Sequence, residues 1–271
     1  MTLQHKFWKI APQPPSNTRP LRGAYIYIAR VDTANDLLLD GCLEILGKDE
    51  HERARSFRFV SDKNTYITAH VLLRSVLSLH FPIPPKNWIF RTSSLGKPEQ
   101  INLPDKVHFN ISHTRGMVCC ALSLYQVGID IESISSMGKL ESLNSVFSSQ
   151  EVRDIYFQPE PDKHLRATIY WTLRESLLKS TGEGISGLTK NFSFSIDDSH
   201  GRIYFRDQQS RSMLSKWQFS TFLVDNHYVV SGSVDSSADI IQTIHPYFDE
   251  TIQLIGVSQN TRVILKQRYY E

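Results

Sequence analysis

Two carboxylates lie two residues apart in an otherwise apolar segment, VGIDIESI, at residues 127–134. Successive side chains of a β-strand point to opposite faces, so Asp130 and Glu132 should share one face, roughly 7 Å apart along the strand. Like charges placed side by side on a sheet repel each other. Edge-strand charges that oppose aggregation are one explanation for such a pair. A bound cation that neutralises both carboxylates is the functional alternative.

A third carboxylate lies in WTLRESLLKSTGEG, at residues 171–184, which has the pattern of a helix. Glu175 and Lys179 are four residues apart and share a helical face, which is typical of a surface ion pair of small energetic value. Together with the two strand acids, however, Glu175 can complete an oxygen site for Mg²⁺, a cation that keeps water and substrate phosphates in its shell. Arg174 and Lys179 flank this acid and are predicted to bind phosphate oxygens.

Several polar and basic residues in upstream loops favour a ligand that contains a diphosphate. They are Ser112, His113 and Arg115 in NISHTRG, Lys97 in the turn SLGKP, and Arg53, Arg55 and Arg58 in HERARSFRF. Each has a simpler explanation when taken alone. His113 is then a loop histidine, Lys97 a solvated turn lysine, and the three arginines the polar face of a short helix.

The hydrophobic pattern divides the chain into two series of elements with the same order, a strand, a short helix, a long helix and further strands. The first series contains a strand at 23–31, helices at 33–46 and 63–81, and the strands WIFRT, VHFNIS and MVCCALSLY. The second contains VGIDI, helices at 148–157 and 163–181, the latter ending at Gly182, and four strands between residues 191 and 234.

Two pairs of segments match at an offset of 100 residues. LLRSVLSL begins at residue 72 and TLRESLLK at 172, while MVCCALSLY begins at 117 and WQFSTFLVD at 217. Chance is the alternative, because the identities are few. We predict an α/β (α+β) fold with two similar subdomains related by pseudo-twofold duplication, each with a long helix packed on a small, mostly antiparallel sheet. The seam between the halves, where VGIDIESI lies, is then a natural cleft.

The expected organisation is an extended N-terminal arm at 1–20, subdomains at 21–126 and 127–235, and a C-terminal extension at 236–271 to which no role is assigned. The net charge of +2 argues against a nucleic-acid binder. The three cysteines form no disulfide framework, and neither a signal peptide nor a membrane span is recognisable. These features predict a cytoplasmic protein. P-loop, dinucleotide-binding, nucleophile-elbow and Cys-x-x-Cys signatures are also missing from the sequence.

The paired motifs VGIDIES and WTLRESLLKSTGEGI resemble the signature of the 4′-phosphopantetheinyl transferases, and GKP at 96–98, FNISHT at 109–114 and RARSFRF…LLRSVL extend the match. The resemblance covers about residues 22 to 235 and is to the surfactin-type, pseudo-dimeric branch, which implies a monomer. It implies transfer of phosphopantetheine from coenzyme A to a serine of an apo acyl or peptidyl carrier protein, with release of adenosine 3′,5′-bisphosphate. A catalytically inactive module that binds carrier domains or coenzyme A is the alternative.

The resemblance also assigns roles to individual residues. Asp130, Glu132 and Glu175 match the ligands of Mg²⁺, with Mn²⁺ as the alternative ion, and Glu175 or a metal-bound water is the base. Lys179 matches the lysine that holds the diphosphate. Ser112 and His113 match contacts to the 3′-phosphate of coenzyme A, and Lys97 and Arg53 match basic positions around the nucleotide. Arg174 replaces a family lysine, which keeps the charge but argues against a proton-donor role.

Overall fold

The computed structural model describes residues 23–31, 42–92, 98–100, 107–136, 138, 140, 145–182, 192–207, 217–235, 245–246 and 261–266. The predicted arm at 1–20, most of the helix expected at 33–46, and Lys97 lie outside these residues. None of the helices among them has both the length and the apolar content that a bilayer span requires.

The N-terminal half carries two helices and five strands among the described residues. They are β1 (Ala24–Arg30), α2 (Lys48–Arg55), α3 (Val60–His80), the 3₁₀ turn η2 (Pro85–Asn87), β2 (Phe90–Thr92), β3 (Pro98–Gln100), β4 (His108–Thr114) and β5 (Met117–Ser123). The proline-rich PIPP segment at residues 82–85 follows the C-cap of α3, where proline cannot continue the helix.

The C-terminal half repeats this order and adds strands from the tail. Its elements are β6 (Val127–Ser133), η3 (Ile134–Ser136), α4 (Ser149–Phe157), α5 (Glu160–Thr181), β7 (Phe192–Asp197), β8 (Arg202–Asp207), β9 (Trp217–Val224), β10 (Tyr228–Asp235), β11 (His245–Pro246) and β12 (Thr261–Lys266). Ser148 and Glu151 form a capping box at the start of α4. Gly182, with φ of 79°, ends α5 in the left-handed conformation.

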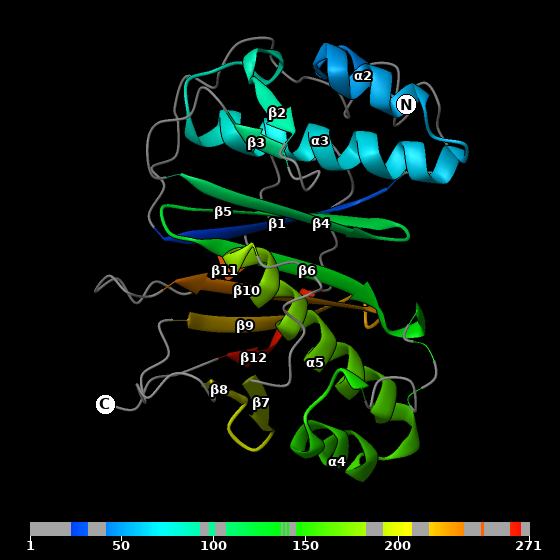
Figure 1. The fold of residues 1–271 in the computed structure, drawn as a ribbon, viewed down its shortest axis with the longest axis vertical. Helices are drawn as coiled ribbons and strands as arrows, with labels where there is room; N and C mark the ends of the chain where they lie inside the picture. The colour runs from blue at the N-terminus through cyan, green and yellow to red at the C-terminus, as the bar shows by residue number, and fades with distance from the viewer. Residues whose placement is uncertain are drawn as a thin grey trace, which may run out of the picture.

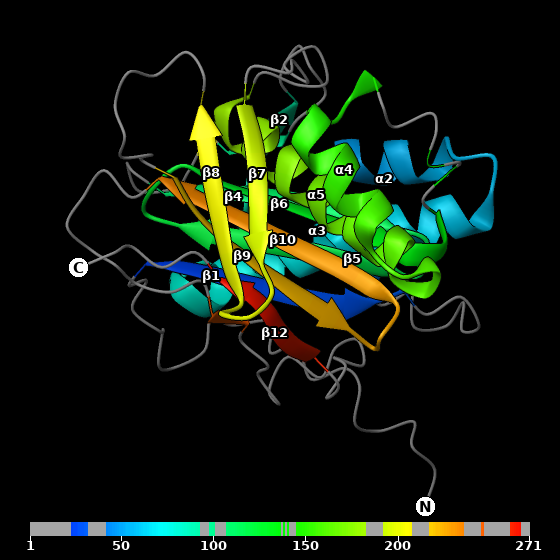
Figure 2. The ribbon, with the colours of Figure 1, turned by 90° about the horizontal axis from the view of Figure 1, so that it is seen from below.

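Two sheets form the middle layers of the molecule, with helices on the outside (Figure 1). The first sheet has the order β11-β1-β5-β4, and the second has the order β6-β10-β9-β12-β8-β7. Apolar residues of β1, β5, β6, β9 and β10 form one buried cluster between the sheets. The long helix α3 packs on the outer face of the first sheet and α5 on β6 and β10. The β7–β8 hairpin lies at the end of the molecule away from α2 and α3 (Figure 1), and Figure 2 shows it from that end.

The two halves have the same topology, which confirms the predicted duplication. Within the sheets, β1-β5-β4 corresponds to β6-β10-β9, with every neighbouring pair antiparallel. The sequence match between residues 117 and 217 was therefore wrong. It aligned β5 with β9, whereas β5 is a central strand that corresponds to β10. β5 and β9 are both largely apolar and almost fully buried, so their composition does not distinguish one strand from the other.

A matched ion pair joins the two helices of each half. Arg74 of α3 binds Glu50 of α2 with its Nη2 and Oε2 2.7 Å apart, and Arg174 of α5 binds Glu151 of α4 at 2.6 Å. Both glutamates are third in their helices and also accept the backbone N–H of the N-cap residue, at 2.7 Å. Each glutamate thus caps the N-terminus of its own helix and also binds the arginine of the neighbouring long helix. The offset of 100 residues between the two arginines reflects a real structural repeat.

The tail contributes strands to both sheets, a role that the sequence did not predict. Residues His245–Pro246 pair in parallel with β1, at the edge of the first sheet. Residues Thr261–Lys266 pair with β9 and join it to β8 in the second sheet. Pro246, which interrupts the amphipathic pattern of the tail, is compatible with an edge strand because it needs no backbone N–H.

Candidate active site

The candidate site forms where the edge strands of the two sheets meet. Polar side chains at alternate positions of β4 contact the neighbouring edge of β6. Asn110 Oδ1 accepts the backbone N–H of Ile129 at 3.3 Å. Ser112 Oγ donates to Asp130 Oδ1 at 2.8 Å, and Thr114 Oγ1 donates to Glu132 Oε2 at 3.2 Å. The two acids therefore point to one side of β6, as the sequence predicted.

Helix α5 brings the third acid to this seam because it approaches β6 very closely at Gly128. A Cβ atom on Gly128 would lie 1.9 Å from the carbonyl oxygen of Ser176 and 2.7 Å from the backbone nitrogen of Ser180. Only glycine leaves room for this contact. The helix is held further by Ser233 Oγ, which donates to the same Ser176 carbonyl at 2.9 Å. Glu175 and Lys179, which directly precede the contacting residues in α5, are thereby positioned near Asp130.

Gly128→Ala should destabilise the protein by at least 1–3 kcal/mol, the usual cost of overpacking a core. The added methyl group overlaps backbone atoms of α5, which cannot rotate out of the way as a side chain can. Urea unfolding of the variant and of wild type measures the difference. Gly138→Ala is the matched control, because a Cβ there meets nothing within 4 Å. Equal stability of Gly128→Ala and wild type would contradict the close contact.

Lys179 pairs with the strand acid rather than forming only the local helix pair suggested by its spacing. Its Nζ lies 2.5 Å from Asp130 Oδ1 and 2.8 Å from Ser112 Oγ. Burial tends to lower the pKa of Lys179, but the charge of Asp130 and the hydrogen bond to it outweigh this effect and raise the pKa. The ammonium group is therefore fully protonated at neutral pH.

The surroundings of the seam disfavour the ionised form of two of its carboxylates. Burial first, and then the negative charge of Asp130, raise the pKa of both Glu132 and Glu175. Asp130 Oδ2 and Glu175 Oε1 are buried, and neither has a hydrogen-bond partner. Such oxygens are costly unless a donor or a cation satisfies them. In the described part of the chain, no three His, Cys, Asp or Glu side chains are already close enough together to hold a metal ion.

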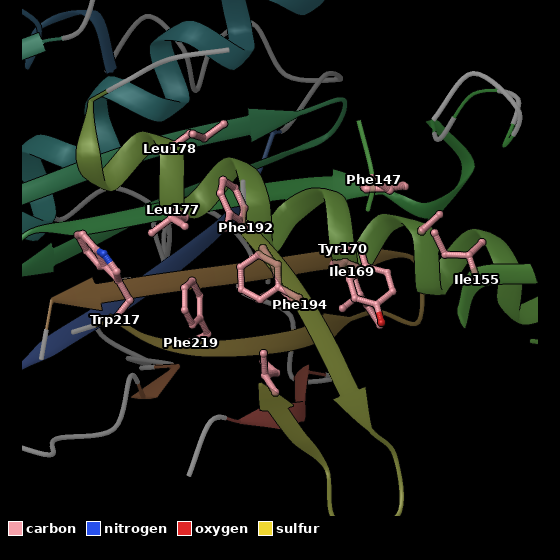
Figure 3. Packing of buried hydrophobic residues seen from close by; sticks show 14 of the residues in the cluster. Phe147, Ile155, Ile169, Tyr170, Leu177, Leu178, Phe192, Phe194, Trp217 and Phe219 are labelled. Atoms are coloured by element: carbon pink, nitrogen blue, oxygen red, sulfur yellow. The ribbon is translucent and has the colours of Figure 1, made fainter. Parts of the chain in front are cut away.

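The predicted phosphate-binding role of Arg174 is contradicted by its position. The residue is completely buried, and its Nη2 donates to Glu151 Oε2 at 2.6 Å and to the carbonyl oxygen of Phe192 at 3.0 Å. Its guanidinium also lies 4.6 Å from the centre of the Phe192 ring. Phe192 belongs to the core between α5 and the second sheet (Figure 3). Successive helical residues point about 100° apart, so Arg174 enters the core while Glu175 points to the seam.

The other residues predicted to contact the ligand lie in different parts of the structure. Ser112 is buried and belongs to the acid cluster, whereas the next residue, His113, is exposed and has the opposite strand orientation. Arg53 is exposed on α2, with its guanidinium 5.0 Å from the centre of the Phe57 ring. Arg55 and Arg58 are exposed as well. Ser112 and His113 thus point to opposite faces of β4 and do not form a single ligand contact.

Sequence reasoning missed Asn110, Thr114 and Gly128 as site-forming residues. The signal for the first two was the alternation in NISHT, which places Asn110, Ser112 and Thr114 on one face of a strand. Gly128 lies beside the acids in VGIDIES, where a glycine inside a strand marks the close approach of another backbone.

The corresponding positions of the N-terminal half carry different chemistry. β1 and β6 both have seven residues, and in both the second, fourth and sixth face the long helix. Tyr27 and Ala29 of β1 therefore correspond to Asp130 and Glu132. By the helix offset, Leu79 corresponds to Lys179. Tyr27 donates to or accepts from His80 Nε2 at 2.6 Å, so this side of the molecule holds an aromatic pair.

Comparison with known proteins assigns both halves to one enzyme family. A family model for the 4′-phosphopantetheinyl transferase superfamily matches residues 126–231, and a model for the N-terminal part of a 4′-phosphopantetheinyl transferase matches residues 35–124. The first match contains all four residues of the carboxylate and lysine cluster. The chain belongs to the 4′-phosphopantetheinyl transferase superfamily and is an enzyme of the phosphopantetheinyl transferase class.

The relatives place the chain in the Sfp-type branch. It is 28% identical to the 4′-phosphopantetheinyl transferase Sfp of Bacillus subtilis over 218 residues, which cover 80% of this chain and 90% of the relative. It is 31% identical to HetI of Nostoc sp. over 193 residues, 69% of this chain and 78% of the relative. For psf-1 of Bacillus pumilus the identity is 30% over 163 residues, with 60% and 69% covered.

Proposed function

We propose that this chain transfers the 4′-phosphopantetheine group of coenzyme A to a serine hydroxyl of an apo acyl or peptidyl carrier protein, with adenosine 3′,5′-bisphosphate as the second product. The main support is the convergence of Asp130, Glu132, Glu175 and Lys179 from two elements at the seam of the two halves. All four belong to one chain, so the proposed site is complete in a monomer.

Asp130, Glu132 and Glu175 would hold Mg²⁺, or Mn²⁺ as the alternative. They offer the oxygen donors that these ions prefer, and two of the oxygens are buried and unpartnered. A bound cation supplies charge neutralisation for the diphosphate and for the departing phosphate. It would also offset the negative charge of Asp130, which together with the larger effect of burial raises the pKa of both glutamates.

The protein side chains supply the remaining steps. Lys179 donates to oxygens of the diphosphate and stabilises charge on the leaving group. The serine oxygen of the carrier attacks the β-phosphorus, and the bond from this phosphorus to the bridging oxygen breaks, so that adenosine 3′,5′-bisphosphate leaves with the electron pair. Glu175 or a water accepts the serine proton, because the hydroxyl is a weak nucleophile until a base removes its proton.

The decisive experiment mixes the purified protein with coenzyme A, Mg²⁺ and an apo carrier protein, and weighs the carrier by mass spectrometry. The expected result is a gain of one phosphopantetheine group, dependent on the cation and on the acceptor serine. A carrier of unchanged mass across acyl and peptidyl carriers would contradict the proposal. It would favour a module that binds carriers or coenzyme A without catalysis. The replacement of the family lysine by Arg174 does not support that alternative, because Arg174 is buried in the core.

His113→Ala should reduce discrimination between coenzyme A and 3′-dephospho-coenzyme A. Although the His113 side chain is exposed to solvent on one side, partial desolvation by the surrounding protein, and then the charge of Lys179, lower its pKa, so the free ring is neutral at pH 7. A phosphate close to the ring favours its protonated form. Such a charged hydrogen bond is worth roughly 1.5–3 kcal/mol, so wild type should prefer coenzyme A by about tenfold or more.

Calorimetric titration of both ligands into both proteins measures this preference. His164→Ala is the matched control, since this histidine is exposed near the start of α5. The preference should persist in the control and largely disappear in His113→Ala. The same preference in all three proteins would assign the 3′-phosphate contact to another residue.

A further inference from the structure

Lys179 holds the same carboxylate that a divalent cation would need. Its ammonium group lies 2.5 Å from Asp130 Oδ1, and Ser112 Oγ bridges the two by accepting from Lys179 and donating to that oxygen, both at 2.8 Å. The Asp130 side chain is only 4% exposed, while that of Lys179 is 29% exposed. One oxygen of the acid thus has two donors, and the other, Oδ2, is unpartnered.

We propose that Lys179 is an internal counter-ion that keeps the cation site closed in the ligand-free protein, and that a diphosphate ligand opens the site by drawing the ammonium away from Asp130. This inference rests on the function proposed above. An ammonium and a divalent cation repel each other at contact distance, so they compete for Asp130. A diphosphate offers the ammonium new anionic partners and so removes the competitor.

The exchange must take place by movement of the lysine side chain, because α5 itself is fixed. The contact at Gly128 leaves no gap between α5 and β6. Ser233 bonds the carbonyl of Ser176, and Thr172 bonds Ser231 of β10 at 2.7 Å. The four-carbon stem of lysine is flexible, and its 29% exposure gives the ammonium a route toward a ligand on the open side.

Two consequences follow from this competition. The free protein should bind a divalent cation weakly, because Lys179 occupies one oxygen of Asp130. A diphosphate ligand should increase the cation affinity, and by linkage the cation should increase the affinity for the diphosphate by the same factor. Because of Lys179, the cation should bind tightly only when the diphosphate ligand is bound as well.

Manganese binding to the ligand-free protein, followed through the resonance signal of free Mn²⁺, tests the competition. Lys179→Met removes the ammonium and keeps the side-chain length, and it should bind Mn²⁺ at least tenfold more tightly than wild type. Lys179→Arg keeps the charge and should bind as weakly as wild type. Lys163→Met is the matched control on the same helix, where the lysine pairs with Glu160, and it should leave the affinity unchanged.

A second measurement follows the ammonium directly in the wild-type protein. Reductive methylation, read by peptide mass spectrometry, should label Lys179 slowly, and Mn²⁺ alone should accelerate its labelling relative to Lys163 in the same digest. Equal Mn²⁺ affinity of wild type and Lys179→Met, or bound Mn²⁺ without a change in Lys179 labelling, would overturn this inference alone. Failure of all the proteins to bind Mn²⁺, even with coenzyme A present, would overturn the cation assignment as well.

Discussion

Arg174→Ala should lower the free energy of unfolding by about 3–5 kcal/mol, the cost of breaking a buried ion pair by removal of one partner. The change leaves Glu151 completely buried with its backbone hydrogen bonds but without its counter-charge. It also removes the guanidinium from the face of Phe192. Urea unfolding followed by circular dichroism measures this loss. Activity per folded molecule should be nearly unchanged, because Arg174 does not reach the seam.

Two further variants make this test specific. Arg153→Ala removes an exposed arginine from α4 and should change the stability by less than about 0.5 kcal/mol. Arg174→Lys keeps the charge beside Glu151 but lacks the planar guanidinium, so its stability should lie between those of Arg174→Ala and wild type. A stable Arg174→Ala protein that has lost its activity would instead support the phosphate-binding role expected from the sequence.

Asp130→Asn should reduce transferase activity by on the order of 10²–10³ or more, the effect of removing one strong electrostatic contact to a transition state. Asparagine keeps the shape of the side chain and can still accept from Ser112, but it is a poor ligand for a hard cation. Turnover of an apo carrier at saturating coenzyme A and Mg²⁺ measures the loss. Asp162→Asn, at an exposed position in the first turn of α5, is the matched control.

The stability of Asp130→Asn shows whether the charge of Asp130 destabilises or stabilises the cation-free protein. If Asp130 only repelled its neighbours, the variant would be more stable than wild type in the absence of a cation. The structure instead gives Asp130 two donors, Lys179 and Ser112, so removal of its charge should cost a modest amount of stability. Full activity of Asp130→Asn, or activity in the presence of excess chelator, would rule out the proposed cation site.

The sequence predicted the two similar halves and the cluster of carboxylates and lysine because both depend on local patterns. Alternation in a strand places Asp130 and Glu132 on one face, and helical spacing places Glu175 and Lys179 on another element of the same half. Neither pattern says what lies opposite the acids. The contact between β4 and β6 depends on how two sheets pack, and the residues that make it are separated by 18 positions.

The failure at Arg174 has a specific physical cause. A charged residue between Leu173 and Glu175 is expected at a polar site, since buried arginines are rare. Its partner, Glu151, lies on another helix, and only the repeat of Arg74 and Glu50 in the first half indicated the pairing. The misalignment of β5 with β9 has a different cause. Apolar strands have such similar sequences that β5 matched a strand other than its structural equivalent, β10.

The presence of Tyr27, Ala29 and Leu79 at positions that correspond to Asp130, Glu132 and Lys179 has a consequence for mutation. In a dimer of two identical chains, one base change in the gene alters both equivalent positions at once. Here each half is encoded separately, so a substitution at Tyr27 of β1 leaves the acidic cluster of β6 unaltered. Because Tyr27 and Ala29 are buried against α3, such a substitution changes the packing of the N-terminal half while the residues of the proposed reaction centre stay the same.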